Sequence, residues 1–208
     1  MQALITFFSN LQNLEALIKW GGYTVLAVIV FAESGLFFGF FLPGDSLLVT
    51  AGLLASRGYL DLWQMIILLS LMAIAGDSVG YYFGKTAGPK IFTKEKSLLF
   101  AKDHLLKAQA FYEKHGGKTI ILARFMPFIR TFAPIVAGAG RMPYRRFISF
   151  NVWGGILWVT LMLSLGFFLG RVIPHVDRYI HIIIIAVILL SISPGLISWI
   201  RSRRPNKT

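Results

Sequence analysis

The chain has 208 residues, of which 56% are hydrophobic and only 14% are charged. A soluble domain carries about 25% charged residues, so this composition excludes an ordinary soluble fold and indicates a membrane protein. The absence of cysteine excludes disulfides and thiolate chemistry, and four scattered histidines argue against a metal site. The net charge of +12 fits basic cytoplasmic loops better than a nucleic-acid partner, and nothing in the composition calls for a cofactor.

The first predicted element is an amphipathic segment over residues 1–19, which lacks the basic start of a cleaved signal peptide. Residues 20–56 follow, an apolar stretch whose only charges are Glu33 and Asp45. The stretch is too long for one crossing and is broken near Pro43 and Gly44, so it predicts a re-entrant hairpin. The first full transmembrane helix is expected over residues 62–84, with Asp77 near its end.

Residues 85–118 form a polar segment of net charge +5 with apolar residues at helical spacing, which predicts an amphipathic helix on the cytoplasmic membrane surface. Residues 119–140 are apolar again but contain Arg124, Pro127, Arg130 and Pro134. Because the segments on both sides are strongly basic, the positive-inside rule places both ends in the cytoplasm. The stretch therefore predicts a second re-entrant hairpin, in which the prolines break the helix.

Two further transmembrane helices are predicted over residues 147–170 and 179–200, which carry no charge and exceed the roughly 20 residues needed to cross a bilayer. The tail at 201–208 is basic and is expected in the cytoplasm. The chain thus reads as one all-α polytopic membrane domain over residues 1–208, with the final span added after the second hairpin.

An internal repeat is suggested by proline spacing. Glu33 precedes Pro43 by ten residues, and Arg124 precedes Pro134 by ten residues. A hairpin followed by a full span occurs twice, with repeat one over residues 1–84. The loop charges make the two hairpins enter from opposite sides, which predicts an inverted-topology repeat. A chance match of two proline-broken apolar stretches is the alternative, and the side of the N-terminus stays open.

The buried charges are the candidate functional groups. Glu33 and Asp45 in the first hairpin and Arg124 and Arg130 in the second are expected to share one cavity, since ionisable groups in a membrane must pair or meet water. Arginine binds phosphate through two parallel hydrogen bonds, and a buried carboxyl group can carry a proton. Fixed salt bridges between the hairpins are the structural alternative. Asp77 is interpreted as a supporting group.

Two small-residue features complete the pattern. The helix starts expected at Pro43 and Pro134 would point backbone N–H groups and the positive helix end at an anion. Gly76, Gly80, Gly84 and Gly88 leave one face of the first span bare. We favour the interpretation that this face packs against another helix of the same chain, and self-association is the alternative.

These residues resemble the DedA family of bacterial membrane proteins, also called the SNARE-associated or VTT-domain family. The resemblance covers roughly Thr24–Gly170 and rests on Glu33 in Phe-Ala-Glu-Ser, Leu42-Pro-Gly-Asp-Ser, Gly76-Asp77 with Gly80 and Gly84, Arg124-Phe-Met-Pro127 and Arg130 to Pro134, and, after these, Asn151, Gly154 and Trp158. It implies a multi-pass protein of the bacterial inner membrane with paired re-entrant hairpins. It also implies lipid movement across the bilayer, notably of undecaprenyl phosphate, with a required acidic pair matching Glu33 and Asp45 and an arginine pair matching Arg124 and Arg130.

The function expected is therefore transport of an anionic polyprenyl phosphate or phospholipid, coupled to protons, with no catalytic residues. Arg124 and Arg130 are the expected substrate-binding groups, and Glu33 and Asp45 the expected proton-coupling groups. One alternative is a proton-coupled antiporter for small cations or drugs, which would depend chiefly on the acids. Another is a lipid phosphatase, which the sequence disfavours because His104, His115, His175 and His181 all lie outside the hairpins.

Overall fold

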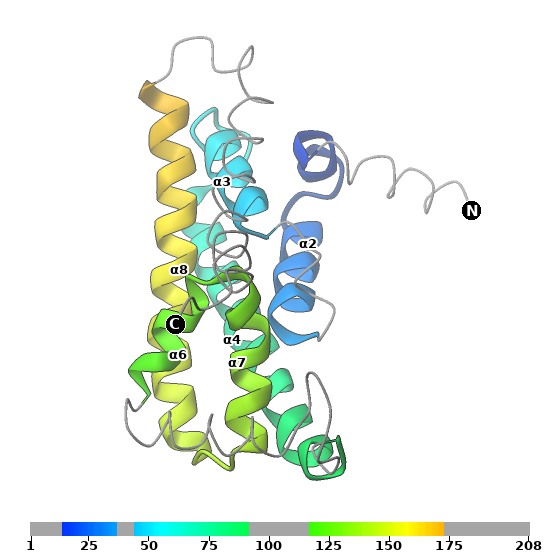
Figure 1. The fold of residues 1–208 in the computed structure, drawn as a ribbon. Helices are drawn as coiled ribbons and strands as arrows, with labels where there is room; N and C mark the ends of the chain where they lie inside the picture. The colour runs from blue at the N-terminus through cyan, green and yellow to red at the C-terminus, as the bar shows by residue number, and fades with distance from the viewer. Residues whose placement is uncertain (1–13, 37–43, 92–116, 173–208) are drawn as a thin grey trace, which may run out of the picture. The chain divides into compact units, whose positions relative to one another are not determined.

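The computed structural model describes residues 14–36, 44–91 and 117–172, and the elements within these ranges are all helices. Figure 1 shows them in chain order as α2 (Leu14–Gly35), α3 (Gly44–Ala55), α4 (Leu62–Ile91), α6 (Lys118–Arg124), α7 (Pro127–Ala139) and α8 (Tyr144–Val172). Helix α2 is interrupted at Gly22, whose φ of 51° lies in the left-handed region that glycine adopts without strain. The all-helical prediction is confirmed for this part of the chain.

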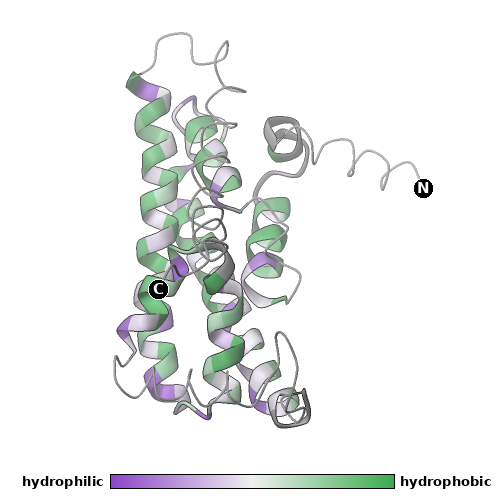
Figure 2. Ribbon diagram, in the orientation of Figure 1, coloured by the Kyte–Doolittle hydropathy of each residue, from purple (hydrophilic) through white to green (hydrophobic). Residues whose placement is uncertain are grey.

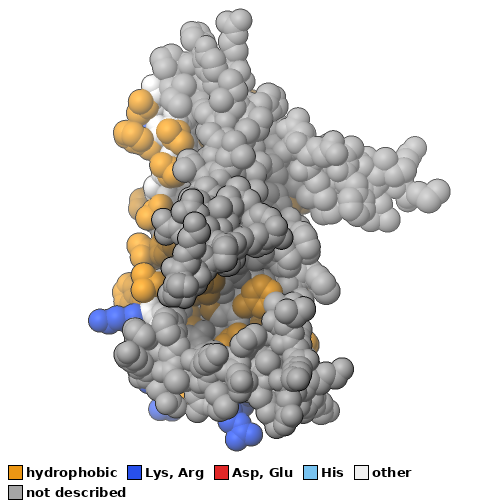
Figure 3. Space-filling view, in the orientation of Figure 1, with side chains coloured by type: hydrophobic (Ala, Val, Ile, Leu, Met, Phe, Trp, Pro, Cys, Tyr) orange, Lys and Arg blue, Asp and Glu red, His pale blue; other side chains and the backbone are white. Residues whose placement is uncertain are grey.

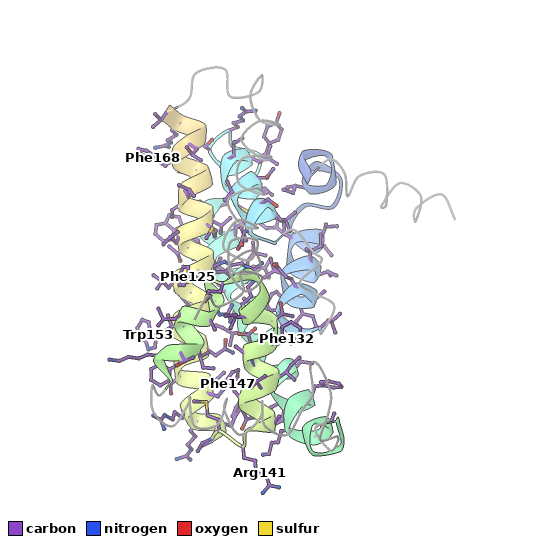
Figure 4. All side chains as sticks on the ribbon, viewed as in Figure 1. Phe125, Phe132, Arg141, Phe147, Trp153 and Phe168 are labelled. Carbon is purple, nitrogen blue, oxygen red and sulfur yellow. The ribbon has the colours of Figure 1, made fainter. Side chains whose placement is uncertain are left out.

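Two of the described helices are long and apolar enough to cross a membrane. They extend over Leu62–Gly88 and Tyr144–Val172, which confirms the helices predicted at 62–84 and 147–170. Many large apolar side chains on both helices are exposed, and Figure 2 shows that α8 is hydrophobic over much of its length. Hydrophobic side chains lie along the length of this helix (Figure 3), and Trp153 and Phe168 project from it into the surroundings (Figure 4). The predicted span at 179–200 lies outside the described residues.

The helices fall into two compact units. One unit comprises residues 27–42 and 65–160, which include the C-terminal part of α2, most of α4, α6, α7 and the first part of α8. The other comprises residues 1–26, 43–64 and 161–208, which include α3 and the end of α8.

Within the first unit, α4 and α8 are antiparallel. The Tyr144 hydroxyl donates to Ser78 Oγ over 3.3 Å, and farther along α8 the Asn151 side-chain amide donates to the Ile74 carbonyl over 3.1 Å. Residue numbers along α8 therefore increase in the direction in which residue numbers along α4 decrease. This antiparallel pairing is what an inverted repeat requires of its two long helices.

Helix α7 lies along α4 in the same direction. Pro134 is close to Gly80, Ile135 to Gly84 and Ala139 to Gly88. Gly76 in turn faces Gly35 of α2, so the bare glycine face of α4 is covered by other helices of the same chain. This finding confirms the packing interpretation of the four glycines.

The second unit repeats this arrangement with the corresponding helices. Helix α3 lies along the end of α8 in the same direction, with Val49 close to Gly166 and Leu53 close to Gly170. A side chain on Gly52 would strike the backbone of Leu163 and Phe167 on α8. In the first unit a side chain on Gly138 of α7 would strike Tyr81 and Lys85 of α4 in the same way.

These contacts give the alignment of the repeat. Leu163, Gly166, Phe167 and Gly170 follow Tyr81, Gly84, Lys85 and Gly88 by a constant number of positions, and Gly138 follows Gly52 as Ile135 follows Val49. These matching contacts support the predicted repeat, which stays a prediction, and they align its halves differently from the proline spacing. Pro134 is not the counterpart of Pro43, because α7 begins at Pro127 and Pro134 lies inside it, whereas α3 begins at Gly44. Pro43 itself lies outside the described residues.

Pro134 does not break its helix, contrary to the prediction. A proline removes one backbone hydrogen bond, here the bond to the Arg130 carbonyl, and its ring crowds that same carbonyl. Seven residues of α7 precede it, and Gly80 of α4 faces it without a side chain. The helix continues past Pro134 to Ala139, and the break occurs before Pro127.

Two boundaries also differ from prediction. Helix α4 continues to Ile91, so residues 85–91 belong to this helix and not to the amphipathic segment; residues 92–116 of that segment lie outside the described residues. Helix α8 begins at Tyr144 and includes Arg145 and Arg146 in its first turn. Of the amphipathic start predicted over residues 1–19, residues 1–13 lie outside the described residues and the rest begins α2.

The helices that cover the glycine faces end in the same way. After α3, the Tyr59 and Gly58 N–H groups donate to the Leu54 and Ala55 carbonyls, and Gly58 has a φ of 79°. After α7, the Met142 and Arg141 N–H groups donate to the Ala137 and Gly138 carbonyls, and Arg141 has a φ of 56°. Both ends are Schellman motifs, but the second places an arginine in the left-handed conformation that favours glycine.

Candidate functional site: buried ion pairs beside Trp158

The two arginines are positioned by the turn between α6 and α7. Helix α6 ends at Arg124, and Phe125 and Met126 leave the helical conformation before Pro127 starts α7. Proline suits this first helical position because its missing N–H would have no partner there. Arg130 then lies one turn into α7, with its backbone N–H bonded to the Met126 carbonyl over 2.9 Å. One short helical hairpin therefore carries both guanidinium groups.

Arg124 is held by three oxygen atoms. Its Nη2 forms an ion pair with the Asp77 carboxylate of α4 and donates to Asn151 Oδ1 of α8 at 2.5 Å and to the Ala73 carbonyl at 3.4 Å. The Asn151 amide in turn donates to the Ile74 carbonyl. Only 4% of Arg124 is exposed. The network therefore fixes Arg124 between the two antiparallel long helices.

Two glycines of α8 lie beside the Arg124 side chain. A Cβ added to Gly154 would lie 3.5 Å from Arg124 Cδ, and one added to Gly155 would lie 3.6 Å from Arg124 Cζ. The aliphatic part and the guanidinium of Arg124 therefore run against the bare backbone of α8. This packing adds a steric constraint to the hydrogen bonds.

Arg130 pairs with a different acid. Its Nη2 forms an ion pair with Glu33 Oε1, which lies near the end of α2. Glu33 is 1% exposed, and the Arg130 side chain is 10% exposed. Breaking such a buried pair by removing one partner leaves an uncompensated charge, which is why the two charges constrain each other.

Trp158 of α8 lies beneath both guanidinium groups. The Arg130 Cζ atom is over the indole ring at 5.0 Å from the ring centroid, and the Arg124 Cζ atom is at 5.9 Å. Trp158 is 1% exposed. The negative face of an aromatic ring attracts a cation, so the indole is a third partner for this pair of charges.

The structure brings together Glu33, Asp77, Arg124 and Arg130 of the predicted residues. Asp45 belongs to the other compact unit, where it is half-buried in the first turn of α3, directly after Gly44. Its predicted grouping with the arginines stays a prediction. Asp77 is more than the supporting group expected, since it is the acid paired with Arg124.

Two residues of the site were not assigned roles from the sequence. Asn151 and Trp158 are respectively 0% and 1% exposed and contact the arginines directly. The feature that could have identified them is the occurrence of an amide side chain and an indole within the uncharged span predicted at 147–170. Within the described ranges, no group of three or more acids or histidines could hold a metal ion.

A second buried cluster lies around Tyr81 of α4. Tyr81 of α4 stacks on Phe147 of α8, with ring centroids 4.7 Å apart, and its hydroxyl donates to the Met142 carbonyl. Ala137, Ile120 and Met142 complete this cluster. It joins α4, α6, α7 and α8 and so fixes the hairpin that carries Arg124 and Arg130.

Comparisons with known proteins identify a family and several relatives of this chain. The model of the VTT domain matches residues 42–168. Protein DedA of Escherichia coli strain K12 is 48% identical over 184 residues, covering 88% of this chain and 84% of its own length. An uncharacterized membrane protein of Mycobacterium leprae is 43% identical over 87% of this chain and 81% of its own length. The inner membrane protein YqjA of E. coli K12 is 37% identical over 72% of this chain and 68% of its own length.

No solved structure matches the chain. The family match nevertheless spans more than half of the sequence and includes α4, the α6–α7 hairpin, α8 as far as residue 168 and every residue of the Arg124 network. The chain therefore belongs to the VTT-domain, or DedA, family of membrane proteins.

Proposed function

We propose that the protein transports an anionic lipid carrier, undecaprenyl phosphate or a related phospholipid, across the bacterial inner membrane in a proton-coupled cycle. The observation that carries the proposal is the Arg130–Glu33 ion pair inside a helical unit whose long helices expose apolar side chains. A guanidinium paired with one carboxylate can exchange it for a phosphate, which offers the same geometry of oxygen acceptors.

The two arginines have different parts in this proposal. Arg124 has three oxygen acceptors, one of them the carboxylate of Asp77, and packs against α8. Arg130 is the more exposed of the two and pairs with an acid from a different helix. We assign phosphate contact to Arg130, while Arg124 contributes a fixed positive charge to the same site.

Proton coupling follows from competition for Arg130. Phosphate arriving at Arg130 displaces the Glu33 carboxylate, and a displaced carboxylate buried at 1% exposure is more stable with a proton bound. Cargo and proton then bind together. Asp45 is proposed as the second proton-coupling group because the family resemblance requires an acidic pair there.

The membrane arrangement belongs to the proposal as well. The α6–α7 hairpin enters from the cytoplasm and returns, and α2 and α3 form the opposed hairpin of the inverted repeat. The hairpin lengths support this arrangement, since seven and 13 residues of helix are too few for α6 or α7 to cross a bilayer. The exchange of one anion for another requires no covalent chemistry, so we propose a transporter and not an enzyme.

The test uses purified protein in liposomes with labelled undecaprenyl phosphate in one leaflet, with and without a pH gradient. The native chain should move the label faster with the gradient. Arg130→Lys keeps the charge but loses the two parallel donors, so it should lose at least about tenfold in transport rate while remaining inserted. Transport of small cations against protons, with no movement of the labelled lipid, would instead support the antiporter alternative.

A further inference from the structure

Trp158 presents a ring face to Arg130, whereas Glu33 binds the edge of the same guanidinium. The Arg130 Cζ atom lies over the indole at 5.0 Å from the ring centroid, and its Nη2 carries the ion pair to Glu33. A guanidinium is planar, with its N–H donors directed outward in the plane and its faces left for stacking. The carboxylate thus engages Nη2, while the indole attracts the cationic group through its ring face.

This separation matters at the moment of exchange. If the proposed function is correct, Arg130 must release Glu33 before it binds a phosphate fully. During this exchange the guanidinium interacts most weakly with an anion. A charge without a partner is costly in a buried site. The indole face stays in contact throughout, because Trp158 is 1% exposed and lies in the middle of a long helix.

The indole stabilises Arg130 equally when it is paired with Glu33 and when it is bound to phosphate, so it does not change the affinity of Arg130 for either anion. It contributes most where the other partner is weakest, which is the transition between the two end states. We propose that Trp158 is a positioning residue that lowers the barrier for exchange of Glu33 for phosphate at Arg130. This inference rests on the proposed function and makes the ring face responsible for the rate of transport and not for the affinity.

The experiment weakens the ring face without changing its shape. Fluorine atoms on the indole withdraw electrons from the face and reduce its attraction for a cation. A chain whose other tryptophans (Trp20, Trp63, Trp153 and Trp199) are replaced by phenylalanine is made with tryptophan and with mono-, di- and trifluorotryptophan at position 158. Undecaprenyl phosphate binding and gradient-driven transport are measured on each form.

The expected result is a transport rate that falls stepwise with fluorination, by roughly tenfold across the series, with Kd for undecaprenyl phosphate changing less than about twofold. The matched control is Trp158→Phe with the other four tryptophans retained. Growth on fluorotryptophan should leave the rate of this control unchanged, because the phenyl ring at position 158 then carries no fluorine.

Three results would overturn the inference. A rate that ignores fluorination would reduce Trp158 to a packing residue. A Kd that rises in parallel with the loss of rate would make it a binding residue. If native protein neither binds nor moves undecaprenyl phosphate, the proposed function itself is wrong and the inference fails with it.

Discussion

Replacing Asp77 with asparagine removes the charge that neutralises Arg124. Arg124 is 4% exposed, and its other two acceptors, the Asn151 side chain and the Ala73 carbonyl, are neutral. Breaking a buried ion pair on one side costs about 3–5 kcal/mol. For a chain of this size, 1 kcal/mol shifts Tm by about 2–4 °C, so Asp77→Asn should lower Tm by roughly 6–20 °C.

The matched control is Asp61→Asn, at the start of the same helix. Asp61 is exposed and its Oδ1 accepts the Gln64 N–H at 2.8 Å, a capping bond that asparagine makes equally well. Thermal unfolding of detergent-solubilised protein should therefore show a large loss for Asp77→Asn and almost none for Asp61→Asn. Adding Arg124→Gln to Asp77→Asn removes both charges and should restore much of the lost stability.

The reasoning would be refuted if Asp77→Asn unfolded within about 0.5 kcal/mol of Asp61→Asn, because Arg124 would then be neutralised by something other than Asp77. It would also be refuted if the double variant lost the sum of the two single losses. In that case the two residues would act independently and the ion pair would not be the cause.

Four further changes test other parts of the structure. Arg141→Gly relieves a left-handed conformation that costs about 1–2 kcal/mol and adds about 0.5–1 kcal/mol of glycine entropy, so the free energy of unfolding should rise by roughly 0.5–1 kcal/mol, while Arg141→Ala should bring no such gain. Gly84→Ala places a methyl group against the Ile135 carbonyl and should destabilise the protein by more than about 1 kcal/mol, whereas Gly80→Ala, whose new methyl would be 3.5 Å from the nearest atom, should change stability little in the same unfolding assay. Glu33→Gln keeps an oxygen for Arg130 but cannot exchange a proton, so lipid-phosphate binding should persist while the response of transport to a pH gradient disappears; gradient-driven transport in this variant would contradict coupling through Glu33. Cysteines placed singly at Lys118 and Arg141, on the two ends of the α6–α7 hairpin, should both resist an impermeant outside reagent, and labelling of only one would exclude the re-entrant arrangement.

The long helices were predictable because a membrane imposes a single requirement on them. Uncharged stretches such as 147–170 must be helical and must be about 20 residues long, and composition alone fulfils both conditions. Glu33, Arg124 and Arg130 were identifiable for the same reason, since a charge in such a stretch needs a partner. The sequence therefore predicted which charged groups are buried more accurately than which groups pair.

The pairing itself depended on packing that periodicity does not encode. Arg124 was expected opposite Glu33 or Asp45, but its acid is Asp77, because the antiparallel contact of α4 and α8 places Asp77 and Asn151 at the end of α6. Pro134 was expected to break the hairpin, but α7 accommodates it with seven helical residues before it and the loss of one backbone hydrogen bond. The helix continues to Ala139 and packs along α4 there, a tertiary contact that the local sequence around Pro134 does not reveal.

The glycine contacts of the two units bear on how the two halves of a repeated membrane protein can be aligned. A position that faces lipid accepts almost any apolar residue, so substitutions there accumulate and erase likeness between the halves. Where one backbone touches another, as at Gly52 and Gly138 or at Gly84 and Gly166, nothing larger than a hydrogen atom fits. A position at a backbone contact therefore accepts fewer residue types than a position that faces lipid. Ancestral correspondence in a duplicated membrane fold survives longest at its tightest helix crossings, and those crossings are the places from which to align the halves.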